Sequence, residues 1–317
     1  MDERRRALRI HIHILIVVTA VAVGLTAAAG FSMTEVWGAS GKTKAASMDL
    51  IRKDGRAFDF RTEAGQKLYG YDTLQGACAD SGYAYLTLYD RTVERCRIVK
   101  VDLKKLCVVK VSAPLPIYHG NNLTFNTKKG LLLATCCRVK GKRAVFIHPG
   151  SLTVAGVKDI RLTKKVKKLP ASERRKYKGF TAIAYNASRD CYVGRLRSSG
   201  NVILFDGNLR PKKYIRLSGK KTKLLNQGMD SVGNRIYDVR SFTGKRRYNM
   251  VTIHTLSGKL VGRMKIPYGK APGSELQCVF HDGGQFYAGI YLTTSQVNDT
   301  KANHVNRINL LYRLNNL

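Results

Sequence analysis

The chain has 317 residues, of which 44% are hydrophobic and 9% aromatic. This length suffices for one large all-β domain or two ordinary domains, and the apolar content excludes a wholly disordered chain. Lysine and arginine number 56 against 21 aspartate and glutamate residues, a formal net charge of +35. Such a charge predicts attraction to polyanions and a strong dependence of binding on salt.

The N-terminus has the pattern of an export signal. Four arginines lie within "MDERRRALR", and an apolar run without charged residues follows over residues 14–33. A basic segment, an apolar run and the small residues 27–29 are typical of a signal peptide, and a run of about 20 residues is also long enough for a membrane anchor. Both interpretations of residues 1–33 stay open. Both place the rest of the chain outside the cell, released or on the cell surface.

Beyond a polar linker over residues 34–48, the sequence is typical of short strands and turns. Segments rich in β-branched and aromatic residues alternate with Gly, Asn, Asp and Lys, and none has a long helical period. Five segments share one plan: a polar residue, in four cases followed by glycine, then a short apolar strand, a turn and a second strand. They begin at Gln75, His119, Lys178, Gln227 and Glu275.

These five openings are 44, 59, 49 and 48 residues apart, and a further pair of strands follows most of them. Four strands in a period of this length are typical of a propeller blade. The expected outer strand of the last blade is residues 55–62, which would close the ring and remove an exposed edge. The predicted fold is all-β: a five-bladed β-propeller of four-stranded blades over residues 49–317, preceded by the signal peptide or signal-anchor helix.

The polar-glycine openings and the second strands "GNRIYDV" and "GGQFYAG" resemble those of secreted bacterial five-bladed β-propellers, over about residues 50–317. That group includes teichoic acid biosynthesis protein C-like and tachylectin-like rings. A more distant likeness is to gluconolactonase-type propellers, whose channel mouth holds a metal on Glu, Asn and Asp. This second resemblance implies a divalent cation on Glu275, Asn121 or Asn122, and Asp230; no other cofactor is expected.

Inner strands of a propeller begin near its axis, so the opening residues are expected to surround one mouth of the channel. Glycine after them fits close approach of backbones there. The amide, imidazole, carboxylate and ammonium groups suit a sugar or polyol. The alternative is that they only satisfy backbone groups and channel water. The candidate ligand-binding residues are Gln75, His119, Asn121, Asn122, Lys178, Gln227, Asp230 and Glu275.

A basic insertion separates the second and third repeats. Residues 158–178 hold ten lysines and arginines against Asp159 and Glu173. Connections between blades lie at the two faces of a propeller, so this insertion is expected to form a basic face that binds an anionic polymer; a merely solvated surface is the alternative. The candidate residues of that face are Lys164, Lys165, Lys167, Lys168, Arg174 and Arg175.

No sequence motif of a known catalytic site is present. The seven cysteines form no CxxC pair and are expected mostly as small hydrophobic residues in strands. The preferred function is therefore non-catalytic binding of an anionic or glycan ligand, such as a cell-wall polymer, by a secreted or surface-anchored propeller. The alternatives are a hydrolase or lactonase with a metal or carboxylates at the channel mouth, and a protein-interaction platform. A monomer is expected, any membrane attachment would run through residues 14–33, and nucleic acid is not the partner expected in vivo.

Overall fold

The computed structural model describes residues 43–68, 70–136, 141–219, 225–241, 249–266, 275–293, 307–315 and 317. All of them belong to one compact unit, Ala39–Leu317. The expected signal peptide or anchor, residues 1–33, lies outside the described residues. None of the described helices is long and apolar enough to span a membrane.

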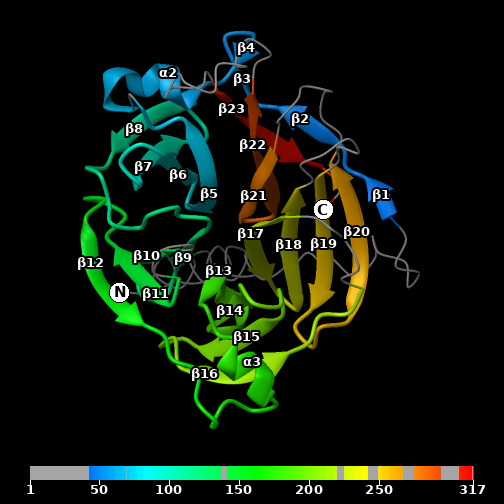
Figure 1. Cartoon of the computed structure of the whole chain (residues 1–317). Helices are drawn as coiled ribbons and strands as arrows, with labels where there is room; N and C mark the ends of the chain where they lie inside the picture. Colours follow the sequence, from blue (N-terminus) through cyan, green and yellow to red (C-terminus); the bar gives the residue numbers. More distant parts are fainter. Residues whose placement is uncertain are drawn as a thin grey trace, which may run out of the picture. The chain divides into compact units, whose positions relative to one another are not determined.

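Five separate sheets stand around a common centre, and each sheet is one blade of an all-β propeller (Figure 1). Within each blade, consecutive strands pair antiparallel, and the first strand lies nearest the centre. Blade I contains β5 (Thr73–Asp80), β6 (Tyr83–Asp90), β7 (Arg95–Asp102) and β8 (Cys107–Val111). Blade II contains β9 (Leu123–Asn126), β10 (Leu131–Thr135), β11 (Arg143–Ile147) and β12 (Val154–Asp159).

The remaining three blades follow the same order along the chain. Blade III contains β13 (Phe180–Asn186), β14 (Cys191–Leu196), β15 (Val202–Asp206) and β16 (Pro211–Ile215). Blade IV contains β17 (Leu225–Val232), β18 (Arg235–Ser241), β19 (Asn249–Thr255) and β20 (Leu260–Ile266). Blade V takes β21 (Glu275–Asp282), β22 (Gln285–Thr293) and β23 (Arg307–Leu314) from the C-terminal part of the chain. The prediction of five four-stranded blades is confirmed.

The fourth strand of blade V comes from the N-terminal part of the described chain. β2 (Met48–Leu50) pairs antiparallel with β23, and β1 (Thr43–Ala45) adds a parallel fifth strand outside β20. Residues 43–48, expected in a polar linker, therefore lie largely in strands. Ring closure between the two ends of the propeller is confirmed, but the strand that closes it is β2.

The prediction that residues 55–62 close the ring is wrong. They form β4 (Arg56–Ala57), which pairs with β3 (Arg52–Lys53), and the start of α2 (Phe60–Ala64). Phe58 and Phe60 are buried and pack with the apolar residues between blades V and I. Their aromatic side chains therefore cover the end of that core instead of alternating along a blade strand.

The other described helices are as short as α2. They are the 3₁₀ turns η1 (Gly65–Leu68) and η3 (Ala187–Arg189), and α3 (Ala171–Arg175). The helix α3 lies in the basic insertion between blades II and III and has no buried residue. The helix itself thus adds surface, while Ile160, Leu162 and Val166 of the same insertion are buried in the core between blades II and III.

The core of the molecule lies between neighbouring blades. Alternating apolar side chains of each sheet pack against the next sheet, so separate apolar clusters lie between blades V and I, I and II, II and III, and III and IV. Burial at about 25 cal/mol per Å² of apolar surface is the main force that holds blade to blade. The centre of the ring is left to polar side chains.

Two glycines permit the blades to converge at that centre. A Cβ on Gly76 would lie 2.7 Å from the Cα of Asn122. A Cβ on Gly228 would lie 2.8 Å from the carbonyl oxygen of Gln277. Both distances are far inside van der Waals contact, so glycine after the opening residue is required by the close approach of neighbouring inner strands, as the sequence predicts.

Candidate functional site

A break in strand register marks the beginning of four inner strands. The pairing skips Gln75 in β5, Thr181 in β13, Gln227 and Gly228 in β17, and Gln277 in β21. A β-bulge of this kind re-aims the side chain of the extra residue. The bulges therefore turn polar side chains out of the blade plane at the start of the inner strands.

Counting from the hairpin turns shows which residues correspond. Each of five residues lies five positions before the last paired residue of its inner strand, and each comes from a different blade. All five are buried. We call them the axial ring: Gln75, Asn121, Thr181, Gln227 and Gln277.

The axial ring lines one cavity of about 240 Å³, which we call the axial cavity. Since all five blades contribute to it, this cavity lies on the propeller axis. Its rim carries the charged residues Arg91 and Arg197, at the ends of second strands, and Glu275, together with His119. A neutral amide and hydroxyl ring thus lies beneath a charged rim.

The rim and ring residues hold one another in place. Gln277 Nε2 and Gln227 Nε2 both donate to Glu275 Oε2, at 2.8 and 3.1 Å. His119 Nδ1 donates to Asn121 Oδ1, and the His119 ring centroid lies 4.8 Å from that of Tyr89. These contacts hold the carboxylate of Glu275, from blade V, and the imidazole of His119, which precedes blade II, in one cavity.

Two amide oxygens of the axial ring have no hydrogen-bond partner in the described part of the chain. They are Oε1 of Gln75 and Oε1 of Gln277, both inaccessible to solvent. A buried acceptor left unpaired costs about 1–3 kcal/mol. A donor group placed in the axial cavity, with a small rotation of either amide, would recover part of that energy.

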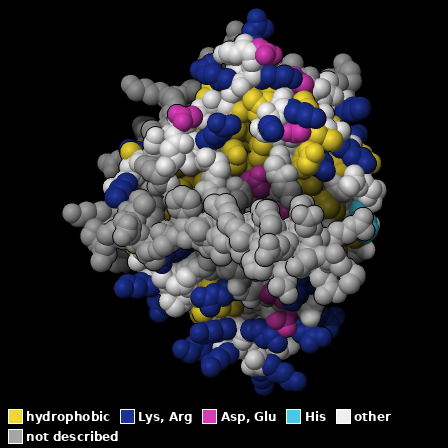
Figure 2. Space-filling view, turned by 180° about the vertical axis from the view of Figure 1, so that it is seen from behind, with side chains coloured by type: hydrophobic (Ala, Val, Ile, Leu, Met, Phe, Trp, Pro, Cys, Tyr) yellow, Lys and Arg dark blue, Asp and Glu magenta, His cyan; other side chains and the backbone are white. Residues whose placement is uncertain are grey.

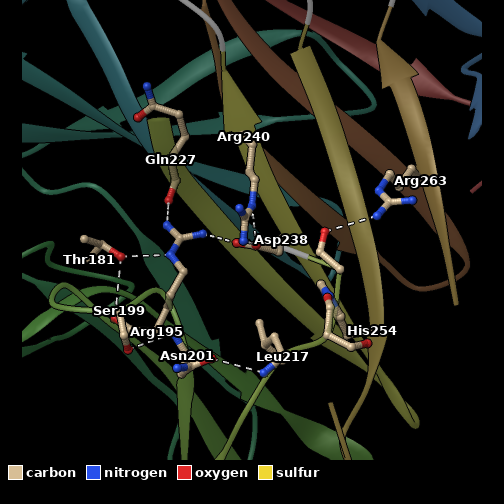
Figure 3. A network of polar contacts seen from close by, with 12 residues as sticks. Thr181, Arg195, Ser199, Asn201, Leu217, Gln227, Asp238, Arg240, His254 and Arg263 are labelled. Atoms are coloured by element: carbon tan, nitrogen blue, oxygen red, sulfur yellow. Dashed lines mark hydrogen bonds and ion pairs between the residues drawn. The ribbon is translucent and has the colours of Figure 1, made fainter. Parts of the chain in front are cut away.

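A buried charge network supports the ring from below (Figure 3). Arg195 has no exposed surface; its Nε donates to Thr181 Oγ1 at 2.8 Å, and its Nη2 donates to the backbone oxygen of Gln227. Its Nη1 pairs with Asp238, which also accepts from Arg240 Nε at 2.7 Å. Burial alone would raise the pKa of Asp238, but the charges of Arg240 and Arg195 outweigh it and lower that pKa to about 2. Arg195 therefore positions two ring members from neighbouring blades.

The eight sequence-predicted ligand-binding residues lie in four different places. Gln75, His119, Asn121, Gln227 and Glu275 line the axial cavity together. Lys178 lies three residues before the bulge at Thr181 and lines a different pocket.

Asn122 has a different place, between inner strands. Its Nδ2 donates to the backbone oxygen of Ile183 at 2.9 Å, and its Oδ1 accepts from the backbone N–H of Met229 at 2.8 Å. The side chain is buried and joins blade II to blades III and IV. It fills the axis below the ring instead of facing the axial cavity.

Asp230 lies at the opposite end of the inner strands, in a second cavity lined by strand ends from all five blades. Its Oδ2 lies 2.7 Å from Nδ1 of His281. Burial lowers the pKa of His281, but the charge of Asp230 and its hydrogen bond outweigh burial, and the pKa is raised overall. Asp230 and Glu275 thus line different cavities.

This separation bears on the metal site that the gluconolactonase-type resemblance implies. Glu275 and Asn121 lie at one mouth, Asp230 lies at the other, and both amide atoms of Asn122 are used between blades. Among the residues that the structure describes, no group of three or more His, Cys, Asp or Glu side chains is placed to hold a metal ion. The implied donor set does not converge, and we derive no metal chemistry from it.

The basic insertion forms part of a charged surface. Lys and Arg side chains gather at the lower end of Figure 2, the end where α3 and β16 lie in Figure 1. Arg174 and Arg175 line the same pocket as Lys178. The other four candidates are exposed outside that pocket: Lys164, Lys165, Lys167 and Lys168.

Six of the seven cysteines lie among the described residues, and none of the six is in a disulfide. Cys78, Cys96, Cys136 and Cys278 are buried, as expected for small hydrophobic residues. Burial raises the pKa of the Cys78, Cys96 and Cys278 thiols. Cys137 lies outside the described residues.

Sequence reasoning missed Thr181, Gln277, Arg91 and Arg197. It aligned the repeats from their polar openings, which puts Lys178 and Glu275 in register with Gln75. Alignment from the hairpin turns backward would have matched Thr181 and Gln277 to Gln75 instead. Arg91 and Arg197 directly follow the second strands of their blades. Because the first and second strands are antiparallel, the end of the second strand lies beside the start of the inner strand.

No protein-family model matches the chain, and no curated protein matches it in sequence. Solved structures do match. The tail fiber of Staphylococcus aureus phage P68 superposes with a TM-score of 0.55 at 11% identity, over 86% of this chain and 53% of that one. A calcium-binding protein, regucalcin, from Agrobacterium tumefaciens gives a TM-score of 0.47 at 12% identity, over 86% of this chain and 95% of that one.

The chain spans about half the length of the tail-fiber chain that it matches. At 11% identity that likeness concerns the fold. What this chain shares with known structures is therefore the β-propeller architecture, here an all-β ring of five four-stranded blades.

Proposed function

We propose that the protein is a non-catalytic binding protein for an acidic sugar unit, held in the axial cavity. The observation that carries this proposal is the axial ring: one hydrogen-bonding side chain from each blade, with two buried amide oxygens that lack a partner among the described residues. Amides and a hydroxyl both donate and accept, which suits the hydroxyl groups of a sugar.

The charged rim supports an acidic ligand over a neutral one. Arg91 and Arg197 face the cavity against a single carboxylate, Glu275, which already accepts from two amides. Guanidinium groups bind carboxylates in a planar, paired geometry. A sugar carboxylate at the rim and sugar hydroxyls at the ring would use both sets of groups.

The size of the cavity supports a single sugar unit. Its volume of about 240 Å³ is below the roughly 300–1,000 Å³ of pockets that enclose drug-sized ligands. A terminal or protruding unit of a longer glycan would fit this description as well as a free sugar.

Binding is favoured over glycoside hydrolysis by the carboxylates present. Hydrolysis of a glycoside by the usual route uses two carboxyl groups that flank the bond. Glu275 is the single carboxylate among the described residues that line the axial cavity. Its hydrogen bonds to Gln227 and Gln277 suit a positioning role at the rim.

We further propose that binding takes place outside the cell, with an acidic cell-wall glycan as the partner. The basic and apolar N-terminal segment supports export. The polar-glycine openings support a place among secreted bacterial five-bladed propellers of the teichoic acid biosynthesis protein C-like group. These proposals differ from a protein-interaction platform, which would not need a converging polar ring.

The test is binding of small saccharides to the purified protein, measured by calorimetry and by ligand-observed NMR. Glucuronic and galacturonic acid are expected to bind more tightly than glucose and galactose. Gln277→Met keeps the side-chain length but removes the amide, and should weaken binding about two- to tenfold, the value of one hydrogen bond.

Gln285→Met is the matched control, because Gln285 is the first residue of β22, next to the hairpin turn and at the other end of β21 from Gln277. Its affinity for the uronic acids should be unchanged. Absence of binding to every saccharide at millimolar concentration would refute the proposal. Release of a shortened product from an oligosaccharide would instead identify a hydrolase.

A further inference from the structure

We infer that the protein has a second binding site, independent of the axial cavity, for a ligand with two or more closely spaced phosphate groups. We call it the basic pocket. It opens between the outer hairpin of blade II and the insertion that carries α3, and its volume is about 730 Å³. Its charged lining residues are Lys142, Arg143, Asp159, Arg161, Arg174, Arg175 and Lys178.

The charge balance of the basic pocket is strongly positive. Six cationic side chains line it against one carboxylate, and that carboxylate, Asp159, lies 3.1 Å from Nε of Arg143. Within the described residues, the other five cations form no ion pair with a carboxylate. Like charges this close repel one another unless an anion lies between them.

The other acidic residue of the insertion contacts blade III instead of the basic pocket. Glu173 lies on α3 beside Arg174, but its carboxylate accepts from Tyr214 Oη at 3.2 Å and from Asn201 Nδ2 at 3.3 Å, both in blade III. The short helix therefore directs its acidic residue to blade III, while both of its arginines line the basic pocket.

The wall of the basic pocket is held by contacts that do not involve the charged groups of its lysines and arginines. Tyr177 Oη donates to the backbone oxygen of Ile160 at 3.1 Å, and the Tyr177 ring packs edge-on against Phe180 at 5.4 Å. The backbone N–H of Ile160 donates to the oxygen of Lys142 at 2.8 Å. The wall is therefore built before a ligand arrives, which reduces the entropy lost on binding.

Phosphate is the anion that this arrangement favours. Three arginines without an acidic partner among the described residues offer planar forks that bind phosphate oxygens in pairs. A phosphate monoester carries about 1.5–2 negative charges at neutral pH, against one for a carboxylate. The volume of about 730 Å³ lies in the roughly 300–1,000 Å³ range of ligand pockets, so more than one phosphate group is accommodated. Such groups are found in free oligophosphates and in phosphorylated ends of longer molecules.

The experiment measures tripolyphosphate binding to the whole protein by calorimetry at several salt concentrations. The wild-type protein should bind tripolyphosphate at least tenfold more tightly than orthophosphate or citrate, and binding should weaken as salt rises. Arg174→Gln together with Arg175→Gln should weaken it at least tenfold. This variant should fold normally because α3 has no buried residue.

Lys164→Gln together with Lys165→Gln is the matched control. It removes the same charge from the same insertion but outside the basic pocket, and it should change tripolyphosphate affinity less than twofold. An equal loss in both double variants would mean diffuse attraction to a basic surface and would overturn the inference. Citrate binding as tight as tripolyphosphate would overturn the choice of phosphate, and no binding near 0.15 M salt would remove the site.

Unchanged tripolyphosphate binding in Gln277→Met is also expected, since that residue lies in the axial cavity. Failure of saccharide binding would therefore leave the basic pocket standing, and failure of tripolyphosphate binding would leave the axial cavity standing. If the natural ligand is the phosphorylated end of a longer molecule, that molecule should displace tripolyphosphate from the wild-type protein. The same molecule should bind the Arg174/Arg175 variant more weakly.

Discussion

Arg195 puts a guanidinium group with no exposed surface directly beneath two members of the axial ring. Its charge is balanced by Asp238, which is shared with Arg240. A buried pair of this kind is an uncertain source of net stability, but removal of one partner leaves a charge without its counterpart in a low-dielectric surrounding. The residue is therefore both a structural support and a positioning residue for the ring.

We expect Arg195→Met to lower the free energy of unfolding by about 3–5 kcal/mol and to weaken saccharide binding in the axial cavity. Guanidinium denaturation followed by fluorescence measures the first effect and calorimetry the second. Arg263→Met is the control, because Arg263 is partly exposed and donates to one backbone oxygen. A loss below about 1 kcal/mol for Arg195→Met would show that Arg240 alone satisfies Asp238.

At the scale of elements, most strands were predictable and the closing strand was not. The inner and second strands carry β-branched and aromatic residues that recur with the blades, as in "YAYLTLYD" of β6. β2 is the tripeptide "MDL", too short to show alternation. The segment "GRAFDFRT" looks more like a strand, but Phe58 and Phe60 serve the core between blades V and I. Which segment fills a free edge depends on where the chain can reach, and local sequence does not contain that information.

The same limit applies to the axial ring. The sequence identified Gln75, Asn121 and Gln227, because polar residues beside glycine stood out at the repeat openings. Thr181 and Gln277 belong with them only because one residue is skipped in the pairing of β13 and β21. A bulge leaves little trace in a single sequence, since it is defined by the partner strand.

A chain that starts at residue 51 should be less stable than one that starts at residue 43, because it lacks β1 and β2. The loss should be about 2–5 kcal/mol, the sum of a few backbone hydrogen bonds to β23 and β20. Denaturant unfolding measures the loss. The exposed edge of β23 should also pair with a second copy, which size-exclusion chromatography detects. Equal stability of the two chains would show that the pairing of β2 with β23 and of β1 with β20 contributes nothing to the free energy of unfolding.

At the scale of the whole molecule, the formal charge of +35 opposes compaction. Since acidic residues are few, most of the positive charges on the described surface have no ion-pair partner there. Self-repulsion of this kind is long-ranged and is screened by salt. The same surface that attracts an anionic ligand therefore costs stability when no anion is present.

Raising sodium chloride from about 0.01 to 0.1 M shortens the screening length from about 30 to 10 Å. We expect the melting temperature to rise over that interval, and to rise further when tripolyphosphate replaces chloride at equal ionic strength. Differential scanning calorimetry gives both values. Sucrose at matched osmolarity controls for solvent exclusion. A melting temperature that falls with salt would show that attractive ion pairs outweigh the repulsion.

The seam between β2 and β23 also sets an order of events during synthesis. Asn315 Nδ2 donates to Asp49 Oδ2, and these residues are 266 positions apart. At roughly 5–20 residues per second, a ribosome needs on the order of 10 to 50 seconds to travel that distance. During this time β2 has already been synthesised, but β23, the strand with which it pairs, has not. A ribosome stalled before Arg307 would carry a nearly finished ring in which β2 has no partner strand, so blade V is completed only when the last strand, β23, has been made.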